Sequence, residues 1–250
     1  MEKDKLSNMR FLGLDLAWAP RQSSGGAVME QTEDGIELIS TTSLRAHEDV
    51  LRWISKNRGR DGTVICLNAP LIVENTGGRR PVDKQLEEHF SPYEVKEYTV
   101  NTVNASYPRT MARSLTRMGF DSNPQATGDR VIESCTQAAQ VLLFGLTRVL
   151  RTKSGPIRGR KDAAHRYREQ IYGKLPFSKL ELQDSDALID LVEADMGAMN
   201  GTRLGEFEEK LDAVMSAYVA GYLYICGPDE CAFLGDLATG YILLPNADGE

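Results

Sequence analysis

The sequence predicts a mixed α/β fold, in which a three-stranded antiparallel meander is followed by parallel strands and helices flank the sheet. Two observations support this prediction. Three short apolar segments follow one another near the start of the chain, and glycine-containing turns separate them. A helical pattern then separates the third segment from a further β-branched run, and a helix between two strands is typical of a crossover that makes the strands parallel.

The three segments of the meander are read from their apolar residues and turns. The first strand is predicted over residues 11–17, which are apolar except for Asp15. Two glycines open the second strand, over 27–30. The third strand, over 35–40, alternates polar and apolar residues, and Asp34 begins the turn before it.

The rest of the chain is predicted from hydrophobic periodicity. Helical spacing predicts helices over 45–57, 82–90, 106–118, 138–150, 160–173, 184–198 and 205–225. Short apolar runs predict strands over 63–67, 130–133 and 240–245. We therefore expect a single domain over residues 1–250, with a helical insertion at about 71–125 and a basic linker at 151–161.

Composition narrows the class of protein. The net charge of −7 argues against indiscriminate affinity for nucleic acid, although a local basic groove is compatible with it. The four cysteines lack the spacing of a zinc site, and we expect them to be plain thiols. The charged first five residues do not resemble a signal peptide, and no apolar run is long enough for a membrane span, so a cytoplasmic protein without membrane contact is expected.

Polar side chains follow the predicted parallel strands. Asp15 lies within the first strand, Asn68 follows the fourth, and Glu133 ends a later one. Side chains at the carboxyl ends of adjacent parallel strands converge, because such strands lie only about 4.8 Å apart. Asp212 lies beside the apolar stripe of the last long helix, from which it can point at the sheet edge. A buried aspartate is costly without a partner such as a metal ion or a hydrogen-bonded network.

The order of these strands and polar residues along the chain resembles that of the ribonuclease-H-like fold. It resembles more closely the predicted-nuclease family catalogued as domain of unknown function 429. The segments that carry the resemblance, in chain order, are residues 13–15, 65–71, 78–83, 131–134, the helix at 212–220 and the last strand at 240–245. Together they span about residues 10–245.

The resemblance implies a metal-dependent nuclease that hydrolyses phosphodiester bonds in DNA or RNA. A carboxylate cluster of Asp15, Glu133 and Asp212 would hold two Mg²⁺ or Mn²⁺ ions, one activating a water and the other stabilising the leaving oxygen. Asn68 stands where the family usually has an acid, and its carbonyl oxygen would be a neutral auxiliary ligand. Arg79 and Arg80 are candidates for a phosphate contact, because guanidinium matches phosphate bidentately.

Each candidate residue also has a structural interpretation. Asp15 could be a member of a buried ion-pair network. Glu133 could be a solvated residue at the end of a strand, and Asp212 an acid on an exposed helix face. The two arginines fit a solvated turn equally well. The basic residues of 151–161 fit either a nucleic-acid backbone contact or a solvated, mobile run.

Two other functions are compatible with the sequence. Asn68 and the acidic net charge favour a catalytically degenerate binding module of the same fold, for nucleic acid or protein. An ATP-dependent phosphotransferase of the actin-like fold is less favoured. Leu16 and Trp18 follow close after the strand aspartate, and bulky side chains there would keep a phosphate away from the backbone.

Overall fold

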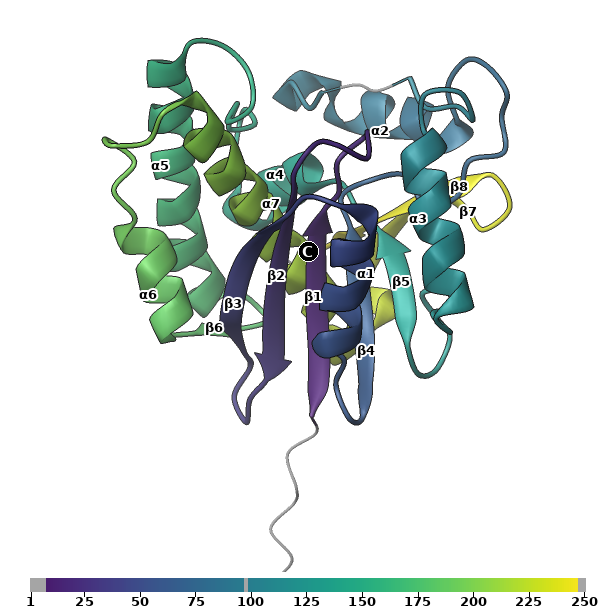
Figure 1. Ribbon diagram of the computed structural model, residues 1–250, viewed down its shortest axis with the longest axis horizontal. Coiled ribbons are helices and arrows are strands. Elements are labelled where there is room, and N and C mark those ends of the chain that lie inside the picture. Colours follow the sequence, from purple (N-terminus) through teal and green to yellow (C-terminus); the bar gives the residue numbers. More distant parts are fainter. Residues whose placement is uncertain (1–7, 97–98, 247–250) are drawn as a thin grey trace, which may run out of the picture.

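A computed structural model of the chain describes residues 8–96 and 99–246 (Figure 1). A six-stranded sheet, with strand order β5-β4-β1-β2-β3-β6, forms its centre, and β7 and β8 form a separate hairpin. The strands are β1 (Met9–Asp15), β2 (Ser24–Gln31), β3 (Ile36–Leu44), β4 (Gly62–Leu67), β5 (Arg130–Glu133), β6 (Leu182–Gln183), β7 (Cys231–Asp236) and β8 (Gly240–Pro245). The charged residues 1–5 lie outside the described residues.

The predicted fold class is confirmed by the pairing of the strands. β2 pairs antiparallel with both β1 and β3, which forms the meander, and the backbone N–H of Thr32 donates to Gly35 O (2.9 Å) at the turn before β3. β4 lies parallel to β1 on its other side, and β5 lies parallel to β4. The sheet is therefore the antiparallel meander with added parallel strands that the resemblance to the ribonuclease-H-like fold implied.

Helices cover both faces of the sheet, with α1 on one face and α7 on the other (Figure 1). The helices of the described residues are α1 (His47–Lys56), α2 (Pro81–Phe90), α3 (Ser106–Arg117), α4 (Thr136–Phe144), α5 (Ile157–Lys174), α6 (Asp186–Glu193) and α7 (Gly201–Cys226), with short 3₁₀ turns at Ser91–Tyr93, Leu175–Phe177 and Pro228–Glu230. None of these helices combines the length and the apolar character that crossing a membrane requires, in the part of the chain described.

The long helix α7 lies unusually close to the sheet because two glycines face it. A Cβ atom on Gly13 would lie 1.9 Å from the carbonyl oxygen of Ala213, and one on Gly25 would lie 2.0 Å from that of Glu209. Both contacts are to backbone atoms of α7. The absence of side chains at these two positions therefore lets the helix reach the end of β1, where Asp15 lies.

Two predicted boundaries and one strand pairing differ from the prediction. α4 ends at Phe144 and not at residue 150, because Gly145 adopts a left-handed conformation (φ 61°) that closes the helix. The basic stretch 151–161 is only partly a linker, since α5 begins at Ile157, directly after Pro156. The closing strand β8 pairs with β7, which was not predicted, and not with the main sheet.

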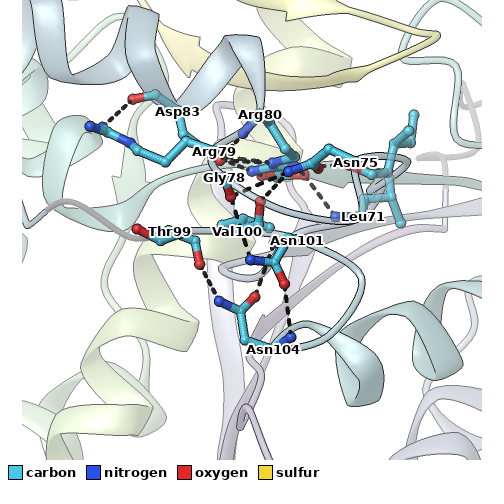
Figure 2. A network of polar contacts seen from close by, with 12 residues as sticks. Leu71, Asn75, Gly78, Arg79, Arg80, Asp83, Thr99, Val100, Asn101 and Asn104 are labelled. Atoms are coloured by element: carbon cyan, nitrogen blue, oxygen red, sulfur yellow. Dashed lines mark hydrogen bonds and ion pairs between the residues drawn. The ribbon is translucent and has the colours of Figure 1, made fainter.

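The predicted insertion contains α2, α3 and a loop network that joins two distant segments. Asn75 Nδ2 donates to the carbonyl oxygen of Val100 (2.8 Å), and the backbone N–H of Thr102 donates to Asn75 O (2.9 Å). Asn101 Nδ2 also reaches the carbonyl oxygen of Gly78 (3.4 Å), and Figure 2 shows these loops side by side. The segments before α2 and before α3 are thus fixed against each other.

Candidate active site

A cavity of about 610 Å³ lies at the carboxyl-terminal edge of the parallel strands. Asp15 at the end of β1, Asn68 just after β4 and Glu133 at the end of β5 all line this cavity. Asp212 lines it from α7. The structure therefore brings all four predicted residues to one cavity, as convergence of parallel strand ends requires.

Lys153 joins the two aspartates. Its ammonium forms ion pairs with the carboxylate of Asp15 and with Asp212 Oδ2, the latter at 2.6 Å. The two aspartates are only 7% and 4% exposed, whereas the Lys153 side chain is 40% exposed and reaches them from the solvent side of the site. One cation thus lies between the two buried carboxylates.

The remaining oxygen of each aspartate accepts a hydrogen bond from a neutral donor. Asn68 Nδ2 donates to Asp15 Oδ1 (2.8 Å), and Tyr167 Oη donates to Asp212 Oδ1 (3.2 Å). Tyr167 is fully buried on α5. These two donors fix the orientation of the carboxylates, so that each aspartate directs one oxygen to the same cation.

The pKa shifts follow from this geometry. Burial raises the pKa of the Asp15 carboxyl, and the nearby Lys153 opposes that shift. Burial disfavours the charge of Lys153, but the two aspartates outweigh it and raise the pKa of the ammonium above its usual value. Lys153 is therefore charged at neutral pH.

Another pair of residues holds the segment that carries Lys153. Arg160 Nε donates to the carbonyl oxygen of Thr152 (2.9 Å), and its guanidinium forms an ion pair with Glu208. Glu208 lies one turn before Asp212 on α7, so a single helix binds both Arg160 and Lys153. Sequence reasoning did not find this pair, although the i, i+4 spacing of the two acids on α7 was a usable signal.

Glu133 belongs to a different ion-pair cluster in the same cavity. Arg80 Nη2 lies 2.6 Å from Glu133 Oε1, and Arg80 Nη1 lies 2.9 Å from Glu133 Oε2. Glu133 Oε2 also accepts from the backbone N–H of Leu71 (2.7 Å). Burial raises the pKa of the Glu133 carboxyl, and Arg80 opposes the shift.

The prediction that Arg80 contacts phosphate was wrong for this structure. A guanidinium has five N–H donors, and Arg80 uses all of them on Glu133, Asp83 and the carbonyl oxygen of Ile72. Its side chain is only 2% exposed. Arg79 lies nearer the surface, pairs with Glu87 (2.5 Å) and donates to the carbonyl oxygen of Asp83.

Asn68 is oriented differently from its predicted role. Its Oδ1 accepts from the backbone N–H of Thr136 (3.2 Å), and its Nδ2 faces Asp15. Because the backbone N–H can only donate, this contact fixes which end of the amide is which. Asn68 therefore holds Asp15 in place. Its carbonyl oxygen, which was predicted to be a neutral metal ligand, accepts from the Thr136 backbone instead.

The basic stretch 151–161 is not solvated throughout. Lys153 and Arg160 make the contacts given above. Arg151 pairs with Glu94, and Lys161 Nζ donates to the carbonyl oxygen of Gly197 (2.8 Å). Lys153, Arg160, Arg151 and Lys161 of this stretch therefore each contact another part of the chain, whereas Arg158 is exposed.

A third carboxylate lies near the aspartate pair. Glu209 precedes Asp212 by one turn of α7 and lines the cavity, and its Oε1 accepts from Ser23 Oγ (2.9 Å). Its Oε2 is buried without a hydrogen-bond partner among the described residues. Burial raises the pKa of Glu209, and the negative charge of Asp15 adds to that shift.

The predicted three-carboxylate metal cluster is not assembled in the part of the chain that the structure describes. Residues 8–96 and 99–246 hold no group of three or more His, Cys, Asp or Glu side chains close enough for one ion. Asp15 and Asp212 do fit a single divalent cation, because Mg²⁺ in proteins is often held by one or two carboxylates, with waters and phosphate completing its shell. The ammonium of Lys153 stands where that cation would lie.

Solved structures of other proteins resemble this chain weakly. The manganese-soaked nuclease domain of the human cytomegalovirus terminase aligns over 88% of this chain and 84% of its own, with 11% sequence identity and a TM-score of 0.33. No model of a protein family matches the chain, and neither does any curated protein. Strand order and register, and not this weak similarity, define the fold.

Proposed function

We propose that this protein is a divalent-metal-dependent nuclease, in which Asp15 and Asp212 hold one Mg²⁺ or Mn²⁺ ion. One observation supports the proposal most: each aspartate is fixed by a neutral donor and directs its second oxygen to the same cation. Both aspartates also line a cavity of about 610 Å³, which leaves room for part of a substrate beside them. The resemblance to the family catalogued as domain of unknown function 429 belongs to the same proposal.

The side chains of the site have separate roles in the proposed reaction. When bound, the metal ion would supply a Lewis acid and an activated water. Asn68 and Tyr167 hold the two carboxylates in orientation. Lys153 must leave its present position for the ion to enter, and its ammonium then remains at the cavity as a donor to a phosphate oxygen.

Glu133 has a structural role in this proposal and is not a metal ligand. Both of its oxygens are taken by Arg80 and by the backbone of Leu71. The proposed site therefore holds one ion between Asp15 and Asp212, and not the two ions that the resemblance implied.

Metal binding tests the proposal directly. Isothermal calorimetry with MnCl₂ is expected to give a binding heat with the native protein and none with Asp15→Asn. Lys153→Met is expected to bind Mn²⁺ more tightly, since no ammonium then competes for the carboxylates. Asp190→Asn, at an exposed position on α6, is the matched control and should bind like the native protein.

Cleavage is measured in parallel with a fluorescently labelled oligonucleotide, with and without Mn²⁺. Metal-dependent cleavage that Asp15→Asn abolishes is the expected result. If folded native protein and folded Lys153→Met both give no binding heat, the metal site does not exist and the proposal fails.

A non-catalytic binding module is the second candidate, and the same cavity gives a specific reason for it. Lys153 already occupies the space between the two aspartates and offsets one of their two charges, and Asn68 supplies no charge. Asn68→Asp places a further carboxylate beside Asp15 and separates the two candidates. Metal-dependent cleavage by this variant alone favours the binding module, whereas cleavage by the native protein excludes it.

A further inference from the structure

A glutamate of α7 has a buried carboxylate oxygen that neither ion-pair cluster of the cavity explains. Glu209 lines the cavity one turn before Asp212, and its Oε2 has no hydrogen-bond partner among the described residues. Native proteins rarely bury such an oxygen, because removing it from water without a hydrogen bond is costly. We therefore looked for a role of Glu209 in the chemistry of the cavity.

The start of β2 and the residue before it fix the position of Glu209. Ser23 Oγ donates to Glu209 Oε1 (2.9 Å), so this oxygen already has a partner. Gly25 lies so close to α7 that a Cβ atom there would lie 2.0 Å from the carbonyl oxygen of Glu209. The backbone and the carboxylate are thus both held, and Oε2 is the atom of Glu209 that can accept from a further donor.

Glu209 lies near the aspartate pair without forming a third ligand of its ion. Asp15, Asp212 and Glu209 are not grouped closely enough to hold one ion together, as for every such triplet in residues 8–96 and 99–246. The charges of Asp15 and Lys153 nonetheless both act on the Glu209 carboxyl. This separation suits a carboxylate that contacts a water beside the ion. Departure of Lys153, which the entry of the ion requires, opens space for that water.

The surroundings of Glu209 make its carboxylate a better proton acceptor than an exposed one. Burial raises its pKa, the hydrogen bond from Ser23 opposes the shift, and the charge of Asp15 adds to it. Lys153 lowers the pKa and Glu206, one turn earlier on α7, raises it. A carboxylate whose pKa is raised toward the working pH takes up a proton more readily in a transition state.

We propose that Glu209 is the proton acceptor for the water that attacks the phosphodiester. This inference rests on the proposed nuclease function and adds the residue that receives the proton. As the water oxygen forms its bond to phosphorus, its proton moves to Glu209 Oε2, and the bond from phosphorus to the leaving sugar oxygen breaks. The leaving oxygen takes a proton from solvent, and Glu209 releases its own proton to solvent before the next cycle.

The pH dependence of cleavage at saturating Mn²⁺ tests this role. Glu209→Gln is expected to lower kcat about 100-fold or more at neutral pH and to leave KM unchanged, because a general base typically contributes this much. Its remaining rate should rise about tenfold per pH unit, since hydroxide then replaces the water. The native rate should level off once Glu209 is ionised. Glu169→Gln, at an exposed position on α5, is the matched control and should behave like the native protein.

Two further measurements do not depend on cleavage. Calorimetry with MnCl₂ is expected to give the same affinity for Glu209→Gln as for the native protein, because Glu209 is not a ligand. Carbon-13 NMR of the glutamate carboxyls in metal-free protein is expected to show a titration above the ordinary value of 4.5 that is absent from Glu209→Gln. A loss of Mn²⁺ affinity as large as that of Asp15→Asn overturns the inference, as does an ordinary pKa.

Urea unfolding verifies that Glu209→Gln folds. If it does not fold, the profile of the native protein decides, and a native rate that rises about tenfold per pH unit up to about pH 8 overturns the inference.

Failure of this inference and failure of the proposed function have different signatures. Native protein that binds Mn²⁺ and cleaves, together with a folded Glu209→Gln that has the native kcat or the native pH profile, refutes the role of Glu209 alone. Native protein that binds no Mn²⁺ refutes the proposed function, and the inference falls with it.

Discussion

Arg80 is a buried arginine whose charge is fully used inside the fold. It lies between Glu133 and Asp83, and its side chain is only 2% exposed. Its burial alone would disfavour the charge, but the two carboxylates raise the pKa of the guanidinium above its usual value. Truncating one partner of such a network leaves the other charges buried and unpaired.

Arg80→Met is therefore expected to lower the free energy of unfolding by about 3–5 kcal/mol. Arg79→Met, at the adjacent and more exposed arginine, is the matched control and should cost no more than about 1 kcal/mol. Urea denaturation followed by circular dichroism measures both. A loss for Arg80→Met as small as that of the control would contradict the structural role assigned to it.

Cys135 is the cavity residue whose chemistry is easiest to misjudge, because it directly precedes the helix α4. A thiol at a helix N-terminus is often reactive, but burial raises the pKa of the Cys135 thiol from 9.0 to about 11, with Asp212 and Glu133 adding to the shift. A raised pKa keeps the thiol protonated at neutral pH. We therefore assign it no nucleophilic role.

Alkylation by iodoacetamide tests this assignment. At about pH 8 the raised pKa predicts a rate for Cys135 about 100-fold lower than for an unburied thiol, since only the thiolate reacts. The rate should rise about tenfold per pH unit until the pH reaches the pKa. Peptide mass spectrometry follows the modification, with glutathione as the unburied reference, and equal rates would refute the raised pKa.

The close contact between α7 and the sheet decides whether Asp212 reaches Asp15. A Cβ atom on Gly13 would lie 1.9 Å from the carbonyl oxygen of Ala213 and 2.3 Å from the backbone nitrogen of Ala217. Helix backbone atoms cannot move singly, so the whole of α7 would shift. Metal binding and stability are therefore coupled at this contact.

Gly13→Ala is expected to lower the free energy of unfolding by about 3 kcal/mol or more and to weaken Mn²⁺ binding in calorimetry. Gly159→Ala on α5 is the control, because a Cβ atom there meets nothing within 4 Å. Alanine in an exposed helix is expected to add up to about 1 kcal/mol. A Gly13→Ala protein with native stability and native Mn²⁺ affinity would show that α7 does not set the geometry of the aspartates.

The elements that local sequence determines were predicted, and those that depend on distant contacts were not. The meander and the strands that end at Glu133 and near Asn68 follow from short apolar runs, so the convergence of their polar ends was predictable. The predicted helix over 138–150 extended beyond the end of α4, because hydrophobic periodicity does not reveal the left-handed conformation of Gly145. The hairpin partner β7 was also not predicted, because its residues are half-exposed and lack a buried apolar pattern.

The ion pairs of the site lie beyond what a sequence pattern reveals. Lys153 is separated from Asp15 by 138 positions, and Arg80 from Glu133 by 53. Both basic residues looked like surface charges in the sequence, because each lies in a glycine-containing, basic stretch. Only the folded arrangement of loops and helices shows that they pair with the carboxylates that the sequence singled out.

At the scale of the whole molecule, an acidic protein is proposed to act on a polyanion. The net charge of −7 repels a nucleic acid at long range, so binding must come from contacts within the cavity. Arg21 and Arg45 are the two arginines on the cavity lining that remain as phosphate contacts once Arg80 is excluded. The salt dependence of binding should report how many such contacts form.

For a single strand bound without metal, when Lys153 stays paired with Asp15 and Asp212, each phosphate contact contributes about −0.7 to the slope of log K against log salt, so the contacts to Arg21 and Arg45 predict a slope of about −1.4. Anisotropy titrations of oligothymidylate over a range of NaCl concentrations measure it. Arg21→Gln should reduce the slope by about 0.7, whereas Arg52→Gln, at an exposed arginine of α1 paired with Asp49, should leave it unchanged. A slope steeper than about −3 would mean that the strand follows a basic surface outside the cavity.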